Sequence, residues 1–126
     1  MTEWVQETVV LAIHDQQIAE HGGLSGVRDL SLLQSALARP RNLEAYGNPD
    51  IAGLAAAYAF GIAKNHAFAD GNKRTSSVVT GTFLLLNGYD FTADEAARLP
   101  IWLELGAGAL SENDLANWLR ANIKKK

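Results

Sequence analysis

The sequence predicts a single all-α domain, and three observations support that prediction. Apolar residues recur at helical spacing along nearly the whole chain, whereas only two short segments resemble strands. A chain of 126 residues has room for one hydrophobic core. Its 48% apolar and 20% charged residues are ordinary for a globular protein and too apolar for a disordered one. We therefore expect one domain over residues 1–126, built from about five to seven helices.

The first predicted helix lies near the N-terminus. One apolar stripe repeats every seven residues along it, at Trp4, Leu11 and Ile18. Gly22-Gly23 follows, and such a pair is typical of a helix C-terminus. Val5–Val10 also resembles a strand, although no partner strand is evident.

A second, shorter helix is expected after the glycine-rich loop. Asp29 or Ser31 can cap its N-terminus. We expect it to end before Pro40, because a proline disfavours helical backbone in the residue that precedes it. Residues 40–50 hold two prolines, a glycine and two asparagines, and they predict a long loop.

The middle of the chain predicts two regular helices separated by a polar break. Asp50 opens the first, whose apolar positions fit a period of 3.6 residues. The second spans about residues 73–87. Its apolar side chains cover nearly the whole circumference: Val78, Val79, Phe83, Leu84, Leu85 and Leu86. A helix that is apolar all round is a buried one, so we expect this helix at the centre of the bundle.

The C-terminal part predicts two more helices. Thr92–Glu95 has the spacing of a capping box, and Pro100 is expected to kink or restart the helix that follows. Ser111 is expected to open the last helix. Tyr89–Phe91 resembles a strand without an evident partner, and Lys124–Lys126 is expected to be a frayed, solvated tail.

Composition argues against several classes of function. A net charge of −3 does not suit a nucleic-acid binder that grips phosphates through a basic face. The absence of cysteine removes disulfides, thiolate metal sites and cysteine nucleophiles. No signal peptide is visible, and the longest nearly apolar stretch, Ile51–Ala63, is too short to span a bilayer. We expect a cytoplasmic protein with no direct nucleic-acid partner and no membrane partner.

The residues that carry chemistry lie in the polar break, at positions 66–74. A Gly71-Asn72 turn that leads into a helix leaves backbone N–H groups without intrahelical partners, where the helix dipole favours an anion. Lys73 and Arg74 add cationic side chains beside those donors, which suits a polyphosphate.

His66 and Asp70 flank this turn. They supply a proton acceptor and a hard oxygen ligand, and a carboxylate beside phosphates is the usual way to hold Mg²⁺. Together with the turn, these residues are the parts of a phosphoryl- or nucleotidyl-transfer site.

Plainer interpretations of the same residues are also open. Taken alone, His66 is explained by a capping role, Asp70 by an Asx turn and Lys73-Arg74 by ordinary surface charge, but all three explanations would have to coincide at the start of one buried helix. As zinc ligands, His66 and Asp70 lack a third partner nearby. Under every interpretation, Phe68 is expected to be a core anchor for the loop.

Three other polar residues outside this segment have side chains that suit either a structural role or a role at the site. We place His14 on the apolar stripe of the first helix, as a structural histidine with a satisfied hydrogen bond. His21 is expected to be a solvated cation at the end of that helix. Lys64 suits a surface position, or alternatively the steering of the phosphorylated ligand toward the site.

Residues 66–74, His-Ala-Phe-Ala-Asp-Gly-Asn-Lys-Arg, resemble the signature of the Fic family: a histidine, then x-Phe-x-(Asp/Glu)-Gly-Asn-x-Arg. Lys73 and Thr75 resemble the death-on-curing (Doc) branch, whose members are toxins of toxin–antitoxin modules. The likeness extends to His14-Asp15, to Gly22-Gly23-Leu24, and to the chain length and helix order. The resemblance therefore implies a Fic-type helical bundle.

The resemblance also implies a role for each residue of the signature. His66 would be the general base that deprotonates a target hydroxyl, a role typically worth about 10²–10⁴-fold in rate. Asp70 would bind Mg²⁺, and Gly71 and Asn72 would form the anion hole. Arg74 would neutralise charge on the phosphates.

Two departures from the Fic signature bear on the reaction. Fic adenylyltransferases have glycine where this chain has Lys73, and a second arginine where it has Ser77. A glycine at position 73 lets the β-phosphate approach the backbone closely, whereas the side chain of a lysine at this position fills that space. Doc-like enzymes are understood to place ATP the other way round and to transfer its γ-phosphate to elongation factor Tu. The resemblance thus implies a protein kinase that uses ATP and Mg²⁺ without the classical kinase motifs.

The resemblance implies regulation by a second protein. The self-inhibitory pattern (Ser/Thr)-x-x-x-Glu-(Gly/Asn) of many Fic proteins is absent, since Glu112 has Gly108 four positions before it. Inhibition would come from a Phd-like antitoxin whose disordered C-terminal segment folds into an apolar groove. Candidate groove walls are the first helices and Ile101, Trp102, Leu103, Leu105 and Trp118.

Two other functions stay open. One is a Fic-type adenylyltransferase that uses the same His66 and Asp70, and the other is a catalytically inactive module that only binds an antitoxin. Lys73 and Ser77 favour the kinase over the adenylyltransferase. The intact base, metal ligand and phosphate arginine disfavour the inactive module.

Overall fold

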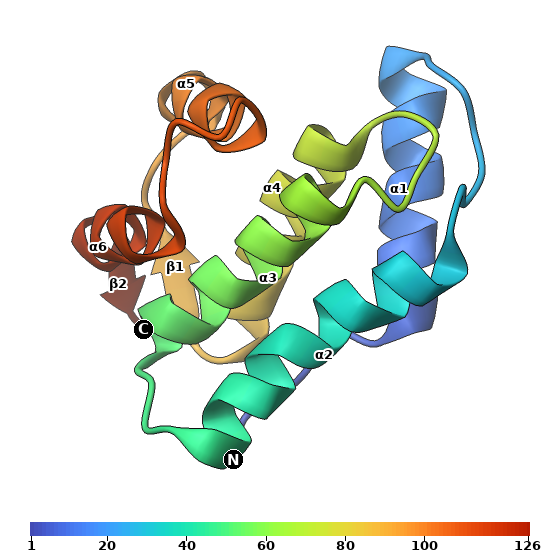
Figure 1. Ribbon diagram of the computed structural model, residues 1–126. Coiled ribbons are helices and arrows are strands. Elements are labelled where there is room, and N and C mark those ends of the chain that lie inside the picture. The colour runs from blue at the N-terminus through green and yellow to red at the C-terminus, as the bar shows by residue number, and fades with distance from the viewer.

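The computed structural model describes residues 1–126 and contains six helices and two short strands (Figure 1). In chain order they are α1 (Glu7–His21), α2 (Leu30–Tyr46), α3 (Ile51–Asn65), α4 (Asn72–Leu86), β1 (Tyr89–Phe91), α5 (Glu95–Gly106), α6 (Glu112–Ala121) and β2 (Ile123–Lys125). The predicted all-α class is confirmed, and the helix count falls within the predicted range. None of the helices combines the length and the apolar character needed to cross a bilayer.

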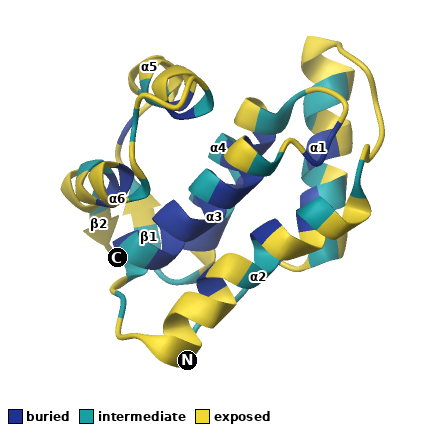
Figure 2. Ribbon diagram, viewed as in Figure 1, coloured by how far each residue is buried: buried dark blue, intermediate teal, exposed yellow.

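The innermost helix is α3, ten of whose fifteen residues are buried (Figure 2). Helices α2, α4, α5 and α6 all pack against it. Most of its buried residues are alanine, with one glycine, and such small side chains let the neighbouring helices approach closely on several sides.

The prediction that α4 is the central helix is wrong, because α3 occupies that place. The last turn of α4 reaches the surface, where Leu85 and Leu86 are 56% and 50% exposed. The buried face of α4 is instead partly polar. Ser76 Oγ donates to the Ala59 carbonyl of α3 at 2.7 Å and accepts from Trp102 Nε1 of α5 at 2.9 Å. These hydrogen bonds allow a polar side chain to replace an apolar one in the core.

Helix α2 continues through Pro40, so the predicted loop over residues 40–50 is wrong except at its end. Pro40 cannot donate a hydrogen bond to the Ala36 carbonyl, but its ring is buried in the packing of α2 on α3. Gly61 of α3 brings the two helices together, since a Cβ there would lie 3.2 Å from Ala36 Cα and 3.0 Å from Arg39 Cδ. Tertiary packing therefore outweighs the proline's local preference.

The N-terminal segment is helical from Glu7, so the strand-like appearance of Val5–Val10 is misleading. Val10 and His14 are the buried residues of α1. Ahead of the helix, Glu3 pairs with Asn87: its N–H donates to Asn87 Oδ1 at 2.8 Å, and Asn87 Nδ2 donates to its carbonyl at 2.9 Å.

The C-terminal tail is ordered, contrary to the prediction. Ile123–Lys125 forms β2, which pairs antiparallel with β1 in the register Tyr89–Lys125 and Phe91–Ile123. The predicted strand at Tyr89–Phe91 is confirmed, and its partner is the last segment of the chain. Lys126 N–H then donates to the Gly88 carbonyl at 2.9 Å.

Side-chain caps mark the start of four helices. Asp29, Asp50 and Ser111 cap α2, α3 and α6, as predicted. Helix α5 is capped by Asp94, which accepts from Ala97 N at 2.9 Å, rather than through the predicted box at Thr92. It runs unbroken through Pro100.

Asp50 links the N-terminus of α3 to α6. Its Oδ1 accepts from Gly53 N at 2.9 Å, which caps α3, and its carboxylate also receives Arg120 of α6 through Nε at 2.6 Å and Nη2 at 2.9 Å. The hydrogen bond from Arg120 is the main cause that holds the pKa of Asp50 below its usual value.

Two substitutions separate these roles of Asp50. Asp50→Asn keeps a good cap and loses only an exposed ion pair, so we expect a loss of up to about 1 kcal/mol in the free energy of unfolding. Asp50→Ala also loses the cap and should cost about 1 kcal/mol more. Urea unfolding at neutral pH measures both losses. Equal losses in Asp50→Asn and Asp50→Ala would contradict the capping role of Asp50.

The same pair predicts a pH dependence. Because the folded-state pKa of Asp50 is lowered, the ion pair stabilises fully above the ordinary carboxyl pKa and is lost as the pH falls through the folded value. The free energy of unfolding of the wild type should therefore exceed that of Asp50→Asn at neutral pH, and the difference should disappear in acid. Urea unfolding of both proteins at the two pH values measures this difference.

Candidate active site

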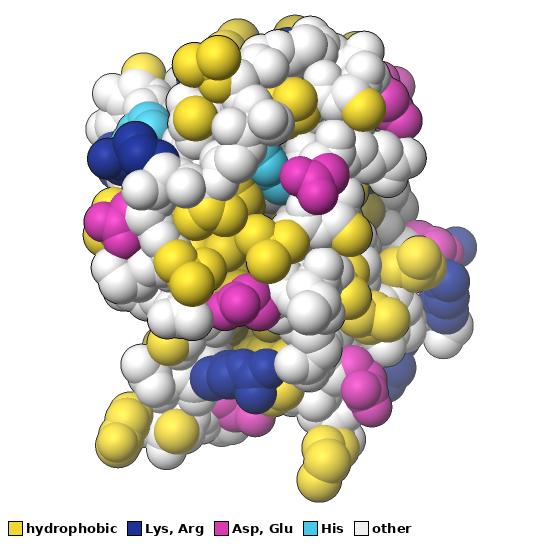
Figure 3. Space-filling model, turned by 90° about the vertical axis from the view of Figure 1, so that its right-hand side faces the viewer, with side chains coloured by type: hydrophobic (Ala, Val, Ile, Leu, Met, Phe, Trp, Pro, Cys, Tyr) yellow, Lys and Arg dark blue, Asp and Glu magenta, His cyan; other side chains and the backbone are white.

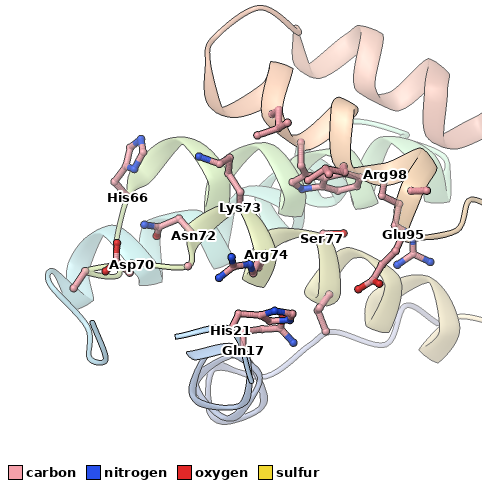
Figure 4. Close-up of a pocket in the computed structure, with 17 residues that line it drawn as sticks. Gln17, His21, His66, Asp70, Asn72, Lys73, Arg74, Ser77, Glu95 and Arg98 are labelled. Carbon is pink, nitrogen blue, oxygen red and sulfur yellow. The ribbon is translucent and has the colours of Figure 1, made fainter. Parts of the chain in front are cut away.

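A cavity of about 750 Å³ lies at the N-terminal end of α4. It is bounded by the loop between α3 and α4, by the C-terminal end of α1 and by one face of α5 (Figure 4). All six residues that the sequence analysis assigned to the site line it: His66, Asp70, Gly71, Asn72, Lys73 and Arg74. The fold thus gathers them around one space.

The loop is held by strand-like pairing with residues 26–29, which precede α2. Val27 and Phe68 form an isolated antiparallel bridge. The backbone hydrogen bonds are Ala69 N to Gly26 O (3.2 Å), and Arg28 N (2.8 Å) and Asp29 N (3.0 Å) to Ala67 O. A segment distant in sequence therefore fixes the backbone beside His66.

His66 has an unusual backbone. It ends α3 at φ 51°, and it is the only residue other than glycine with a positive φ. Such left-handed backbone costs about 1–2 kcal/mol for a residue with a side chain. Arg28 stabilises it, because its Nε (3.0 Å) and its Nη2 both donate to the His66 carbonyl. The imidazole is exposed at the wall of the cavity.

His14 connects the loop between α3 and α4 to α1. Its buried ring stacks on Phe68 with centroids 3.8 Å apart and planes 9° apart, and its Nε2 lies 2.7 Å from the Asp70 carbonyl. Because a carbonyl oxygen only accepts, Nε2 carries the hydrogen. The structural role predicted for His14 and the anchoring role predicted for Phe68 are both confirmed.

Only one oxygen of the Asp70 carboxylate has a hydrogen-bond partner in the protein. Oδ2 accepts from Leu24 N at 2.8 Å, and Oδ1 has no protein partner. One free carboxylate oxygen beside a helix N-terminus fits Mg²⁺, which commonly takes one or two carboxylates plus phosphate oxygens. No group of three or more potential protein ligands is present, so the zinc alternative does not fit.

Gly71 and Asn72 shape the start of α4. Gly71 has φ 77°, and a Cβ there would lie 3.2 Å from Ile18 Cδ1, so both the conformation and the space favour glycine. The Asn72 side chain bonds the Phe68 N–H and carbonyl at 3.1 and 3.0 Å. It therefore closes the loop, and only its backbone N–H is left for an anion.

The first turn of α4 offers backbone donors. No side chain caps it, and the first helical hydrogen bond runs from Thr75 N to Gly71 O at 3.0 Å. The N–H groups of residues 72–74 therefore have no acceptor within the helix. The cationic residues Lys73 and Arg74 belong to the same turn, and both line the cavity (Figure 4).

Lys73 crosses the gap to α5. A Cβ on Gly106 would lie only 2.6 Å from Lys73 Cδ, so the lysine stem occupies the space that this glycine leaves. Ser77, one turn further along α4, also lines the cavity.

Several residues support or line the site without a sequence signal for that role. Arg28 and Leu24 lie outside the cavity lining and hold the loop through long-range contacts, although Leu24 belongs to the Gly22-Gly23-Leu24 run noted above, whereas Arg98 and Glu95 line the cavity from α5. None of them lies near the 66–74 motif in the chain. Besides His14, the sequence analysis considered His21 and Lys64: His21 lines the cavity, whereas Lys64 does not.

Comparison with known proteins identifies the class to which this chain belongs. A sequence model described as the Fic/DOC family matches residues 4–84, and the chain belongs to that family. The resemblance drawn from residues 66–74 is therefore confirmed.

Two relatives are similar over most of the chain. Over 98 residues the chain is 40% identical to the protein named Toxin Doc from Mycolicibacterium smegmatis, which covers 75% of this chain and 72% of that protein. Over 113 residues it is 32% identical to the protein named Protein kinase doc from Escherichia phage P1, which covers 88% of each.

His14 is expected to stabilise the site and the fold together. His14→Ala should lower the free energy of unfolding by about 2–4 kcal/mol, because it leaves a cavity against Phe68 and removes the donor to the Asp70 carbonyl. His21→Ala, at the exposed end of the same helix, is the matched control and should change stability by less than about 0.5 kcal/mol. Urea unfolding measures both, and similar small losses would contradict the fastening role.

Proposed function

We propose that this protein is the toxin of a toxin–antitoxin module and that it transfers the γ-phosphate of ATP to a hydroxyl group of a protein. The main support is that a histidine, a carboxylate, a helix N-terminus and two cations surround one cavity. The relatives named as a toxin and as a protein kinase point the same way.

His66 takes the proton in the proposed reaction. Its exposed imidazole can be reached by a hydroxyl on the surface of another protein, while Arg28 holds its backbone. As the hydroxyl oxygen attacks the γ-phosphorus, its proton passes to the imidazole. The bond from the γ-phosphorus to the bridging oxygen breaks, and ADP leaves.

The N-terminus of α4 holds the phosphates in this proposal. The N–H groups of residues 72–74 donate to phosphate oxygens, and Arg74 neutralises the charge that spreads over the transferred group. The free oxygen of Asp70 would hold Mg²⁺, which when bound neutralises phosphate charge.

The orientation of ATP follows from Lys73 and Ser77. The lysine stem lies across the gap to Gly106, where a glycine at position 73 would leave room for a phosphate against the backbone. Ser77 offers no charge to hold a further phosphate. Both features favour transfer of the γ-phosphate over transfer of AMP.

The partners are part of the same proposal. The target is a translation factor resembling elongation factor Tu in the cytoplasm, and a Phd-like antitoxin inhibits the toxin. The predicted groove needs one correction: Trp102 and Leu105 are buried, so they cannot form its wall. On α5 the exposed apolar residues are Leu99 and Leu103, at 62% and 52%.

The first helices offer a second apolar surface. Figure 3 shows the face that carries α1, where hydrophobic side chains gather near the middle and both acidic and basic ones lie around them. Exposed apolar residues of α1 and the segment leading into α2 are Val9, Leu24, Val27 and Leu30. The amphipathic helix of an antitoxin could bury such a surface.

Labelled ATP tests the proposed transfer. The protein is incubated with bacterial lysate and with ATP labelled at either the α or the γ position. We expect label in protein from the γ position only, and a loss of about 10²–10⁴-fold with His66→Ala. Label from the α position would instead show AMP transfer, and an absence of His66-dependent label would leave a binding module.

Two carboxylates provide a matched pair for the same assay. Asp70→Asn is expected to abolish most of the transfer, because it weakens the ligand for Mg²⁺. Asp90→Asn, on the distant strand β1, should leave the rate unchanged. Equal rates in both variants would contradict the role of Asp70.

The double variant Lys73→Gly with Ser77→Arg tests the orientation of ATP. It restores the two residues of Fic adenylyltransferases, so we expect label from the α position to appear and label from the γ position to fall. Retention of γ transfer alone would show that these two residues do not set the orientation.

A further inference from the structure

The cavity has a second polar end, formed by Glu95 and Arg98 of α5. Figure 4 shows both side chains extending toward α4, at the opposite end of the cavity from His66. We propose that this end binds the purine ring of the nucleotide, with Arg98 donating hydrogen bonds to the ring and Glu95 accepting them. The inference rests on the proposed function, since it places the phosphates at the N-terminus of α4.

Arg98 is held in one orientation before any ligand binds. Its Cζ lies 4.0 Å from the centroid of the Phe91 ring, and its Nε donates to the Ala93 carbonyl at 2.8 Å. Stacking fixes the plane of the guanidinium, and the hydrogen bond fixes its rotation within that plane. A donor fixed in this way loses little conformational freedom when it binds.

The outer nitrogens of Arg98 have no protein partner. The Nε contact is its only hydrogen bond, and none of the four ion pairs of the chain includes it. By contrast, Arg39 and Arg120 pair with Glu112 and Asp50. Partial burial lowers the pKa of Arg98, and the carboxylates of Glu95 and Asp94 oppose that shift. The half-buried guanidinium therefore has N–H groups available for a ligand.

The neighbouring Glu95 indicates the kind of ligand. A second phosphate or a carboxylate would be repelled by it, whereas a nucleobase edge presents acceptors and donors side by side. Arginine donating to purine N7 or O6 and a carboxylate accepting from a ring N–H or amino group are common pairings. Leu99, Leu103 and Val78 line the same cavity and supply apolar surface for the faces of the ring.

The spacing also suits a nucleotide. A Cβ on Gly81 would lie 3.6 Å from Arg98 Nη1, so the guanidinium lies beside that residue of α4. Nine residues separate Asn72 from Gly81, which is about 13 Å along a helix. Phosphates at the first turn of α4 and a base beside Gly81 are therefore separated by roughly the length of an extended nucleoside triphosphate.

Binding of two ligands tests the proposal without relying on catalysis. ATP and tripolyphosphate, each with Mg²⁺, are titrated calorimetrically into the wild type and into Arg98→Met. We expect the wild type to prefer ATP and Arg98→Met to weaken ATP binding by at least about tenfold. Its binding of tripolyphosphate should be unchanged, which also shows that the variant is folded.

Arg41→Met is the matched control. Arg41 also stacks on an aromatic ring, with its Cζ 5.2 Å from the Trp4 ring centroid, but it lies outside the cavity. We expect this variant to bind both ligands as the wild type does. Equal weakening of both ligands by Arg98→Met, or no effect on ATP, would overturn the proposal.

Glu95→Gln provides a second variant with little risk to folding, since Glu95 is exposed. We expect it to change the ratio of ATP to GTP affinity, because it replaces an acceptor with a group that also donates. An unchanged ratio would overturn the role of Glu95. Failure of the proposed transfer would show as an absence of His66-dependent label, whereas failure of the base site would show as ATP binding insensitive to Arg98.

Discussion

The contact between His14 and the Asp70 carbonyl supports the whole site. It ties the turn before α4 to α1, and stacking on Phe68 keeps the imidazole in place. Asn72 then closes the loop through the backbone of Phe68. With the turn fixed in this way, Asp70 and the first residues of α4 line one cavity. The phosphate binding that we propose would therefore depend on a buried histidine whose contacts are with the loop.

The helices could be predicted from the sequence where local signals agreed with packing. Asp50 and Ser111 begin their helices as expected, because a cap acts within four residues. Pro40 misled the prediction because burial against α3 outweighs one lost hydrogen bond. The tail was misjudged because Lys124 gives no sign of its strand partner, which lies more than thirty residues earlier. Long-range pairing is invisible in local patterns.

The residues of the candidate site likewise fall into those that the sequence predicts and those that it does not. His66, Asp70 and Arg74 could be found because one continuous segment carries them, with a spacing that suits a turn before a helix. Arg28 and Arg98 could not be found, since each reaches the site by packing of another segment. The sequence therefore predicts the candidate reacting groups, and the structure adds the groups that hold them and those that line the far end of the cavity.

Both ends of the chain are fastened to a single turn. Glu3 pairs with Asn87, and Lys126 bonds to the adjacent Gly88, directly after α4. A pulling force applied at the two termini would therefore reach this turn directly through these hydrogen bonds. Contacts that hold both termini thus meet at the end of α4 remote from the candidate site.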